Sequence, residues 1–152
     1  MGKVEELLHF FKQLEAYLKF ITEESMGDYL SCEVKFNKDK TRAWLGQPHM
    51  IKKIEKAFGE KVSRLREYKT PGTPGFGIVR PKDDSEKISS EMQSEYMSGV
   101  GMLLYLVKYS RPDIANAVRE LTKCMDGATP AAYKEMLRLV KFVLCTKTGD
   151  SR

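Results

Sequence analysis

The stretch SRPDIANAVRELTKCM, residues 110–125, has the features of an α-helix and sets the class of the fold. Ser110 is the expected N-cap, Pro112 is tolerated in the first helical turn, and Asp113 suits the positive end of the helix dipole. Asp126-Gly127 ends the stretch. Apolar residues recur in it at three- and four-residue spacing, as on the buried face of a helix: Ile114, Ala117, Val118, Leu121 and Met125.

Two more helices are expected on either side. The first begins at Ser89 or Ser90, where Ser90-Glu91-Met92-Gln93 fits a capping box. Its predicted core face is Tyr96, Val100, Leu103, Leu104 and Val107. Gly99 and Gly101 inside it each cost on the order of 1 kcal/mol relative to alanine, which indicates close approach of another helix or of a ligand backbone. The second begins at Thr129-Pro130 and has an apolar stripe of Tyr133, Met136, Leu137, Val140, Val143 and Leu144.

The N-terminal part mixes helix and strand patterns. Residues 3–21 read as an amphipathic helix whose wide apolar stripe predicts packing on more than one neighbour. Tyr29 to Phe36 alternates as a strand does, and Thr41 to Leu45 returns as its partner, so a β-hairpin is expected. Residues 48–58 form the next predicted helix, which opens with proline and carries apolar residues on one side and lysines on the other.

A Pro- and Gly-rich stretch, residues 68–88, is either a linker or a long ordered loop. The expected organisation is a mixed segment over 1–67, this stretch, a helical lobe over 89–147 and a frayed tail over 148–152. The fold class is therefore α+β and mostly helical: an amphipathic helix, a β-hairpin and a helix, followed by a three-helix lobe.

Positive charge is concentrated in the middle of the chain. The net formal charge is +5, but residues 35–69 carry 11 Lys/Arg against 4 Asp/Glu, a net of +7, whereas residues 1–34 carry 3 against 7, a net of −4. Such asymmetry attracts phosphate. The alternative is an ordinary solvated helix face.

Several classes of function are not indicated. No apolar run reaches the roughly 18 residues of a membrane span, and we expect a soluble, intracellular protein without a membrane partner. The isolated Cys32, Cys124 and Cys145 are interpreted as reduced, buried thiols, not as a disulfide framework or a zinc site. No phosphate-binding glycine loop or nucleophile elbow occurs, and Asp83-Asp84 is interpreted as a solvated loop. No catalytic residue, metal or cofactor is predicted.

Two individual residues are candidates for contact with nucleic acid. Trp44, beside lysines on the hairpin, could stack on a base, although a buried core position is the favoured alternative. Arg111 could reach a phosphate, or it could cap a helix or bridge to an acidic neighbour.

Several sequence strings together resemble reverse transcriptases of Ty1/copia-type retrotransposons, with matching order and spacing over roughly residues 3–147. These strings are Tyr29-Leu30, Trp44-Leu45-Gly46-Gln47-Pro48-His49, Lys69-Thr70-Pro71, residues 98–106, residues 110–118 (the most specific) and residues 141–146. The resemblance implies the C-terminal edge of the palm, the thumb and a connecting region. It implies that the hairpin corresponds to the primer grip and that the thumb helices contact the backbone of the template–primer duplex.

The resemblance also implies what is missing. The catalytic Tyr-x-Asp-Asp of the family is absent here, and without two metal-binding aspartates there is no two-metal phosphoryl transfer. The first hypothesis is therefore a non-catalytic fragment of an RNA-directed DNA polymerase that holds an RNA–DNA hybrid, together with the remaining polymerase domains. Its candidate contact residues are Trp44, Gln47, His49, Lys52, Lys53, Lys56 and Arg111. The second hypothesis is a retroelement-derived structural or RNA-clamping subunit of a large ribonucleoprotein assembly that binds structured RNA.

Overall fold

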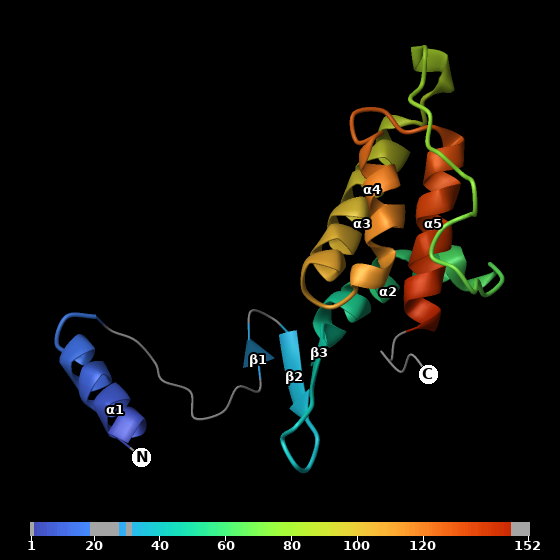
Figure 1. Ribbon diagram of the computed structural model, residues 1–152. Coiled ribbons are helices and arrows are strands. Elements are labelled where there is room, and N and C mark those ends of the chain that lie inside the picture. The colour runs from blue at the N-terminus through green and yellow to red at the C-terminus, as the bar shows by residue number, and fades with distance from the viewer. Residues whose placement is uncertain (1, 19–27, 30–31, 147–152) are drawn as a thin grey trace.

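The protein is described by a computed structural model that covers residues 2–18, 28–29 and 32–146 (Figure 1). It is a mostly helical α+β protein, as predicted, with one small antiparallel sheet in the order β1-β2-β3. The elements are α1 (Gly2–Glu15), β1 (Asp28–Tyr29), β2 (Cys32–Phe36), β3 (Ala43–Gly46), α2 (Pro48–Ser63), the 3-10 turn η1 (Asp84–Glu86), α3 (Ser90–Tyr109), the 3-10 turn η2 (Pro112–Ile114), α4 (Ala115–Thr122) and α5 (Pro130–Cys145).

One hydrophobic core unites α2 with the three C-terminal helices. In Figure 1, α3, α4 and α5 stand side by side, and α2 lies at their lower end. α2 packs mainly along α5, and it contributes Ile54, Phe58 and Val62 to the core. No residue before Met50 belongs to this core within the described part of the chain. The helix predicted for 48–58 is thus five residues longer and serves as the fourth helix of the lobe.

Gly99 allows three helices to approach one another closely. A Cβ atom at this position would lie 2.8 Å from Sδ of Met136 on α5 and 3.1 Å from Cζ of Phe58 on α2. A Cβ atom at Gly101 would meet nothing within 4 Å. Of the two explanations offered by the sequence, close helix approach therefore holds for Gly99, whereas Gly101 faces open space. The predicted core position of Leu104 is wrong, because its side chain is exposed.

The helix caps differ in part from the prediction. Thr129 caps α5 as expected, and its hydroxyl accepts a hydrogen bond from the amide of Ala132. The cap of α3 is Ser89 rather than Ser90, and Gln93 bonds across to the loop before α5 instead of reaching back. Ser110 is the C-cap of α3, not the N-cap of the next helix, because the chain first makes the turn η2.

The Pro- and Gly-rich stretch is an ordered loop held against α5. The guanidinium of Arg138 donates to the carbonyls of Thr70 and Gly72 at 3.2 and 3.0 Å and lies over the ring of Tyr68. The carboxylate of Glu135 accepts hydrogen bonds from the amide and hydroxyl of Thr73. These contacts replace the regular structure that the prolines exclude.

A polar network joins α2, α3 and α5 at the surface. Nζ of Lys61 lies 2.6 Å from both carboxylate oxygens of Glu95, and the hydroxyl of Tyr133 donates to the same carboxylate at 2.7 Å. The hydrogen bond from Lys61, followed by that from Tyr133, lowers the pKa of Glu95. Because Lys61 is paired, it is not part of the free positive charge of α2.

The N-terminal part departs most from the prediction. α1 ends at Glu15, and Val4, Leu7, Leu8 and Phe10 are exposed, so the expected packing on several neighbours is wrong for the described residues. The single strand expected from Tyr29 to Phe36 is also wrong, because β1 and β2 are antiparallel neighbours. The end of the predicted first helix at 19–21 and the frayed tail at 148–152 lie outside the described residues.

The remaining sequence predictions concern thiols and membranes. Cys32 and Cys124 are buried thiols outside any disulfide, but Cys145 is exposed, which corrects the interpretation of all three as buried. In the part of the chain that the structure describes, no helix is both long and apolar enough to cross a membrane.

Candidate nucleic-acid interface

One side of α2 is a row of exposed basic residues. His49, Lys52, Lys53 and Lys56 follow the i, i+3, i+4, i+7 spacing of a single helix face, opposite the side that enters the core. We call these four residues the α2 lysine face. Among the described residues, no carboxylate forms an ion pair with any of its lysines. The lysines of this face therefore lie outside ion-pair distance of the described carboxylates, and one carboxylate, that of Glu60, lies on the same side of α2 one turn after Lys56.

The start of α2 adds no negative charge to this face. Pro48 occupies the first turn, and that turn contains no acidic residue. The positive end of the helix dipole lies at the same end of the helix. Anions are thus favoured near the N-terminus of α2, where the hairpin joins it.

The hairpin places its tryptophan on the surface. Trp44 on β3 pairs with Lys35 on β2, so both side chains are on the same side of the sheet. The side chain of Trp44 is 50% exposed, and the interpretation of Trp44 as a buried core residue is therefore wrong. The other side of the sheet carries Phe36 and Leu45, which are also about half exposed. A half-exposed indole beside an ammonium group can stack on a base.

Gln47 is not an exposed contact residue. Its side chain is 3% exposed, and Oε1 accepts a hydrogen bond of 2.7 Å from the hydroxyl of Ser110. Nε2 has no hydrogen-bond partner. The candidate role of Gln47 in nucleic-acid contact is corrected on this ground, because a buried amide cannot reach a ligand on the surface.

The side chain of Arg111 is also bonded to other residues of the fold. Its guanidinium makes two hydrogen bonds of 2.8 Å to the carboxylate of Asp113, donates to the carbonyl and hydroxyl of Thr146, and lies over the ring of Phe142. The hydrogen bond from Arg111 lowers the pKa of Asp113. Arg111 thus binds its acidic neighbour and the end of α5, which is the alternative that the sequence left open, and it is not available to a phosphate.

Three strings that carry the family resemblance meet at one place in the fold. Gln47 bonds to Ser110, and the next residue, Arg111, bonds to Thr146. These residues lie at the start of α2, the end of α3 and the end of α5. These strings therefore supply partly buried polar contacts between distant segments of the fold.

Two basic residues extend the candidate interface beyond the residues chosen from the sequence. Lys35 lies beside Trp44, and its Nζ is 3.3 Å from a carboxylate oxygen of Glu33 on the same strand. Exposed Arg64 follows Lys56 by eight residues, about two helical turns, at the C-cap of α2. In the sequence, only the positive charge of residues 35–69 indicated these two residues. The register of β2 and β3 and the length of α2 show that they lie on the same side as Trp44 and the lysines, respectively.

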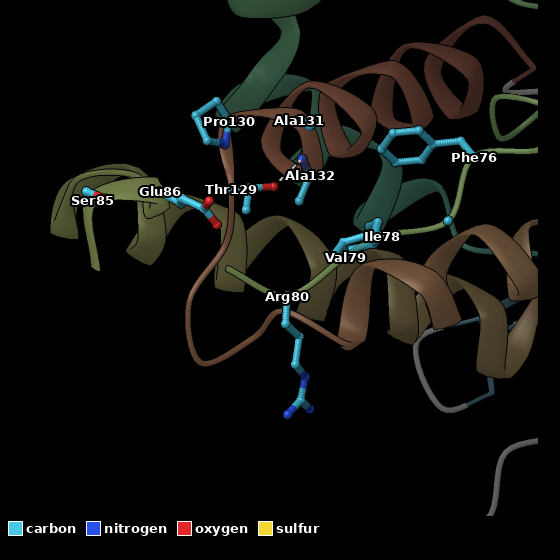
Figure 2. A pocket seen from close by; sticks show the side chains of 11 residues that line it. Phe76, Ile78, Val79, Arg80, Ser85, Glu86, Thr129, Pro130, Ala131 and Ala132 are labelled. Carbon is cyan, nitrogen blue, oxygen red and sulfur yellow. Dashed lines mark hydrogen bonds between the residues drawn. The ribbon is translucent and has the colours of Figure 1, made fainter. Parts of the chain in front are cut away.

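A hollow at the opposite end of the helical lobe offers no comparable chemistry. It measures about 550 Å³ and lies between residues 76–86 and the start of α5 (Figure 2). Its walls are mainly apolar, with Phe76, Ile78 and Val79 facing Pro130 and Ala132. In Figure 2 the side chain of Arg80 extends away from the hollow, and its Nε donates to the carbonyl of Lys123. Nowhere in residues 2–18, 28–29 and 32–146 do three potential metal ligands gather.

Comparison of the chain with protein-family models, curated proteins and solved structures finds no match. The candidate interface therefore depends on its own geometry and charge.

Proposed function

We propose that this chain binds the backbone of a nucleic-acid duplex, in particular an RNA–DNA hybrid, as a non-catalytic, thumb-like part of a Ty1/copia-type reverse transcriptase. The α2 lysine face supplies the phosphate contacts, and Trp44 with Lys35 supplies a stacking position next to it. The observation that carries the proposal is the set of exposed lysines without ion-pair partners on one face of a helix fixed in the core.

A row of lysines on one helix face suits a phosphate backbone better than it suits base recognition. Contacts between lysine and phosphate provide affinity and position, whereas sequence is recognised at base edges. The lysine is a compact charge on a flexible stem and makes no planar two-point contact of the kind that specifies a base. The proposed function is therefore binding without sequence preference.

The proposal assigns no reaction to this chain. The family's Tyr-x-Asp-Asp has no counterpart in the 152 residues. Any contribution to DNA synthesis would come from holding the duplex.

The test is the salt dependence of binding to a fluorescently labelled RNA–DNA hybrid, measured by anisotropy between 50 and 300 mM NaCl. With three or four phosphate contacts, we expect the logarithm of the association constant to fall with the logarithm of salt with a slope of about −3 to −4. Two hybrids of unrelated sequence should bind with equal affinity. Absence of binding at 50 mM NaCl, or an association constant that does not change with salt, would contradict the proposal. Much tighter binding to a structured RNA of equal length would favour the role in a ribonucleoprotein.

A further inference from the structure

The sheet is attached to the helical lobe at a narrow junction. No residue of β2 or β3 belongs to the hydrophobic core, and the strands contact chiefly one another. In Figure 1, β3 runs directly into α2. Gly46 ends β3, and a Cβ atom there would meet nothing within 4 Å. Packing at Gly46 therefore does not determine the angle between the hairpin and α2.

The next residue is held by a bond to a distant helix. Gln47 is the N-cap of α2, but its side chain does not cap that helix. It turns to the end of α3, where the hydroxyl of Ser110 donates to it across a separation of 63 residues. Because the amide is buried, this hydrogen bond is made in surroundings of low dielectric, and a polar group left there without a partner is costly.

The bond is well placed to control orientation. Ser110 is itself fixed, because its amide donates to the carbonyl of Leu106 as the C-cap of α3. Gln47 lies between β3, which carries Trp44, and α2, which carries the lysine face. A constraint on Gln47 is a constraint on the direction in which the hairpin leaves the helix.

We infer that Ser110 is a positioning residue, which through Gln47 fixes the hairpin so that Trp44 and the α2 lysine face form one surface. The hydroxyl of Ser110 does not touch the ligand. The effect of this arrangement on nucleic-acid binding rests on the proposed function, whereas its effect on the hairpin does not.

Trp44 is the only tryptophan, so tryptophan fluorescence of the protein without ligand measures the mobility of the hairpin. Time-resolved fluorescence anisotropy of Ser110→Ala should show faster local rotation of Trp44 than in the unaltered protein. Ser110→Thr keeps the hydroxyl and should restore slow rotation. Gln47→Met removes the hydrogen bond to Ser110 without leaving an unpaired buried amide, and it should also make the local rotation of Trp44 faster. Urea denaturation of each variant establishes that the helical lobe is folded.

Binding of the RNA–DNA hybrid then gives the second readout. Ser110→Ala should weaken it about fivefold, with an unchanged salt slope, because the lysines remain. Adding Trp44→Ala to Ser110→Ala should cost less than Trp44→Ala alone, since the two residues act through the same contact.

The two readouts separate the two claims. If Trp44 rotates equally slowly in folded Ser110→Ala and Gln47→Met, the positioning role is overturned, whatever the hybrid does. If both variants release Trp44 but no form of the protein binds the hybrid, the positioning role stands and the proposed function fails.

Discussion

Replacing Lys52, Lys53 and Lys56 together by alanine should weaken binding to an RNA–DNA hybrid by on the order of 10³-fold at 50 mM salt. The three ammonium groups are exposed on one face of α2 and form no ion pair with a described carboxylate. Each lost phosphate contact should reduce the steepness of the salt dependence by about 0.9, so the three together account for about 2.7. Anisotropy titrations at several salt concentrations measure both quantities.

The matched control removes the same charge elsewhere. Lys82, Lys87 and Lys123 lie around η1 and the end of α4, outside the hairpin and α2. Lys87 and Lys123 make exposed ion pairs with Asp84 and Glu120, so their loss should change the stability of the fold little. The control triple variant should keep the salt slope of the unaltered protein. Equal losses in the two triple variants would mean that net charge, not the α2 lysine face, governs binding.

The second large effect concerns stability and comes from a matched pair of glycines. Gly99→Ala and Gly101→Ala lie on the same helix and gain the same helix propensity, about 1 kcal/mol each. Only at Gly99 does the new methyl meet Met136 and Phe58, both buried. Overpacking of this kind costs about 1–3 kcal/mol, so Gly99→Ala should be less stable than Gly101→Ala by that amount.

Urea denaturation followed by circular dichroism measures the difference between the two glycine variants. Gly101→Ala should exceed the unaltered protein in stability, because its position is open. Equal stabilities for the two variants would show that the side chain of Met136 moves aside without cost, and that α3 is not packed tightly against α5.

The sequence predicted features that depend on neighbours along the chain. Helix periodicity identified most of the residues of α3, α4 and α5 that face the core, although it included the exposed Leu104 and missed the buried Leu106 and Leu139. Thr129-Pro130 marked the start of α5, because a cap bonds to an amide only three residues away. Charge spacing alone selected Lys52, Lys53 and Lys56, since a helix face repeats at three to four residues.

Features that depend on distant neighbours were not predictable in the same way. Nothing near Gln47 indicates a bond to Ser110, and nothing near Arg111 indicates Thr146. Both residues therefore looked like candidate contacts and proved to be internal ones. For Trp44 the error was the opposite one: the sequence favoured a buried position, but the side chain is half exposed. Alternation of apolar and polar residues predicts a strand but does not say which side of the sheet is covered.

The most direct test of the account is to map the binding surface by NMR on the ¹⁵N-labelled protein. On titration with an RNA–DNA hybrid, we expect the largest shifts at the backbone amides of His49, Lys52, Lys53 and Lys56 and at the indole N–H of Trp44. The amides around Lys82, Lys87 and Lys123 should remain unchanged. Shifts concentrated around those three lysines, or no shifts at a salt concentration of 50 mM, would contradict the assignment of nucleic-acid binding to the α2 lysine face.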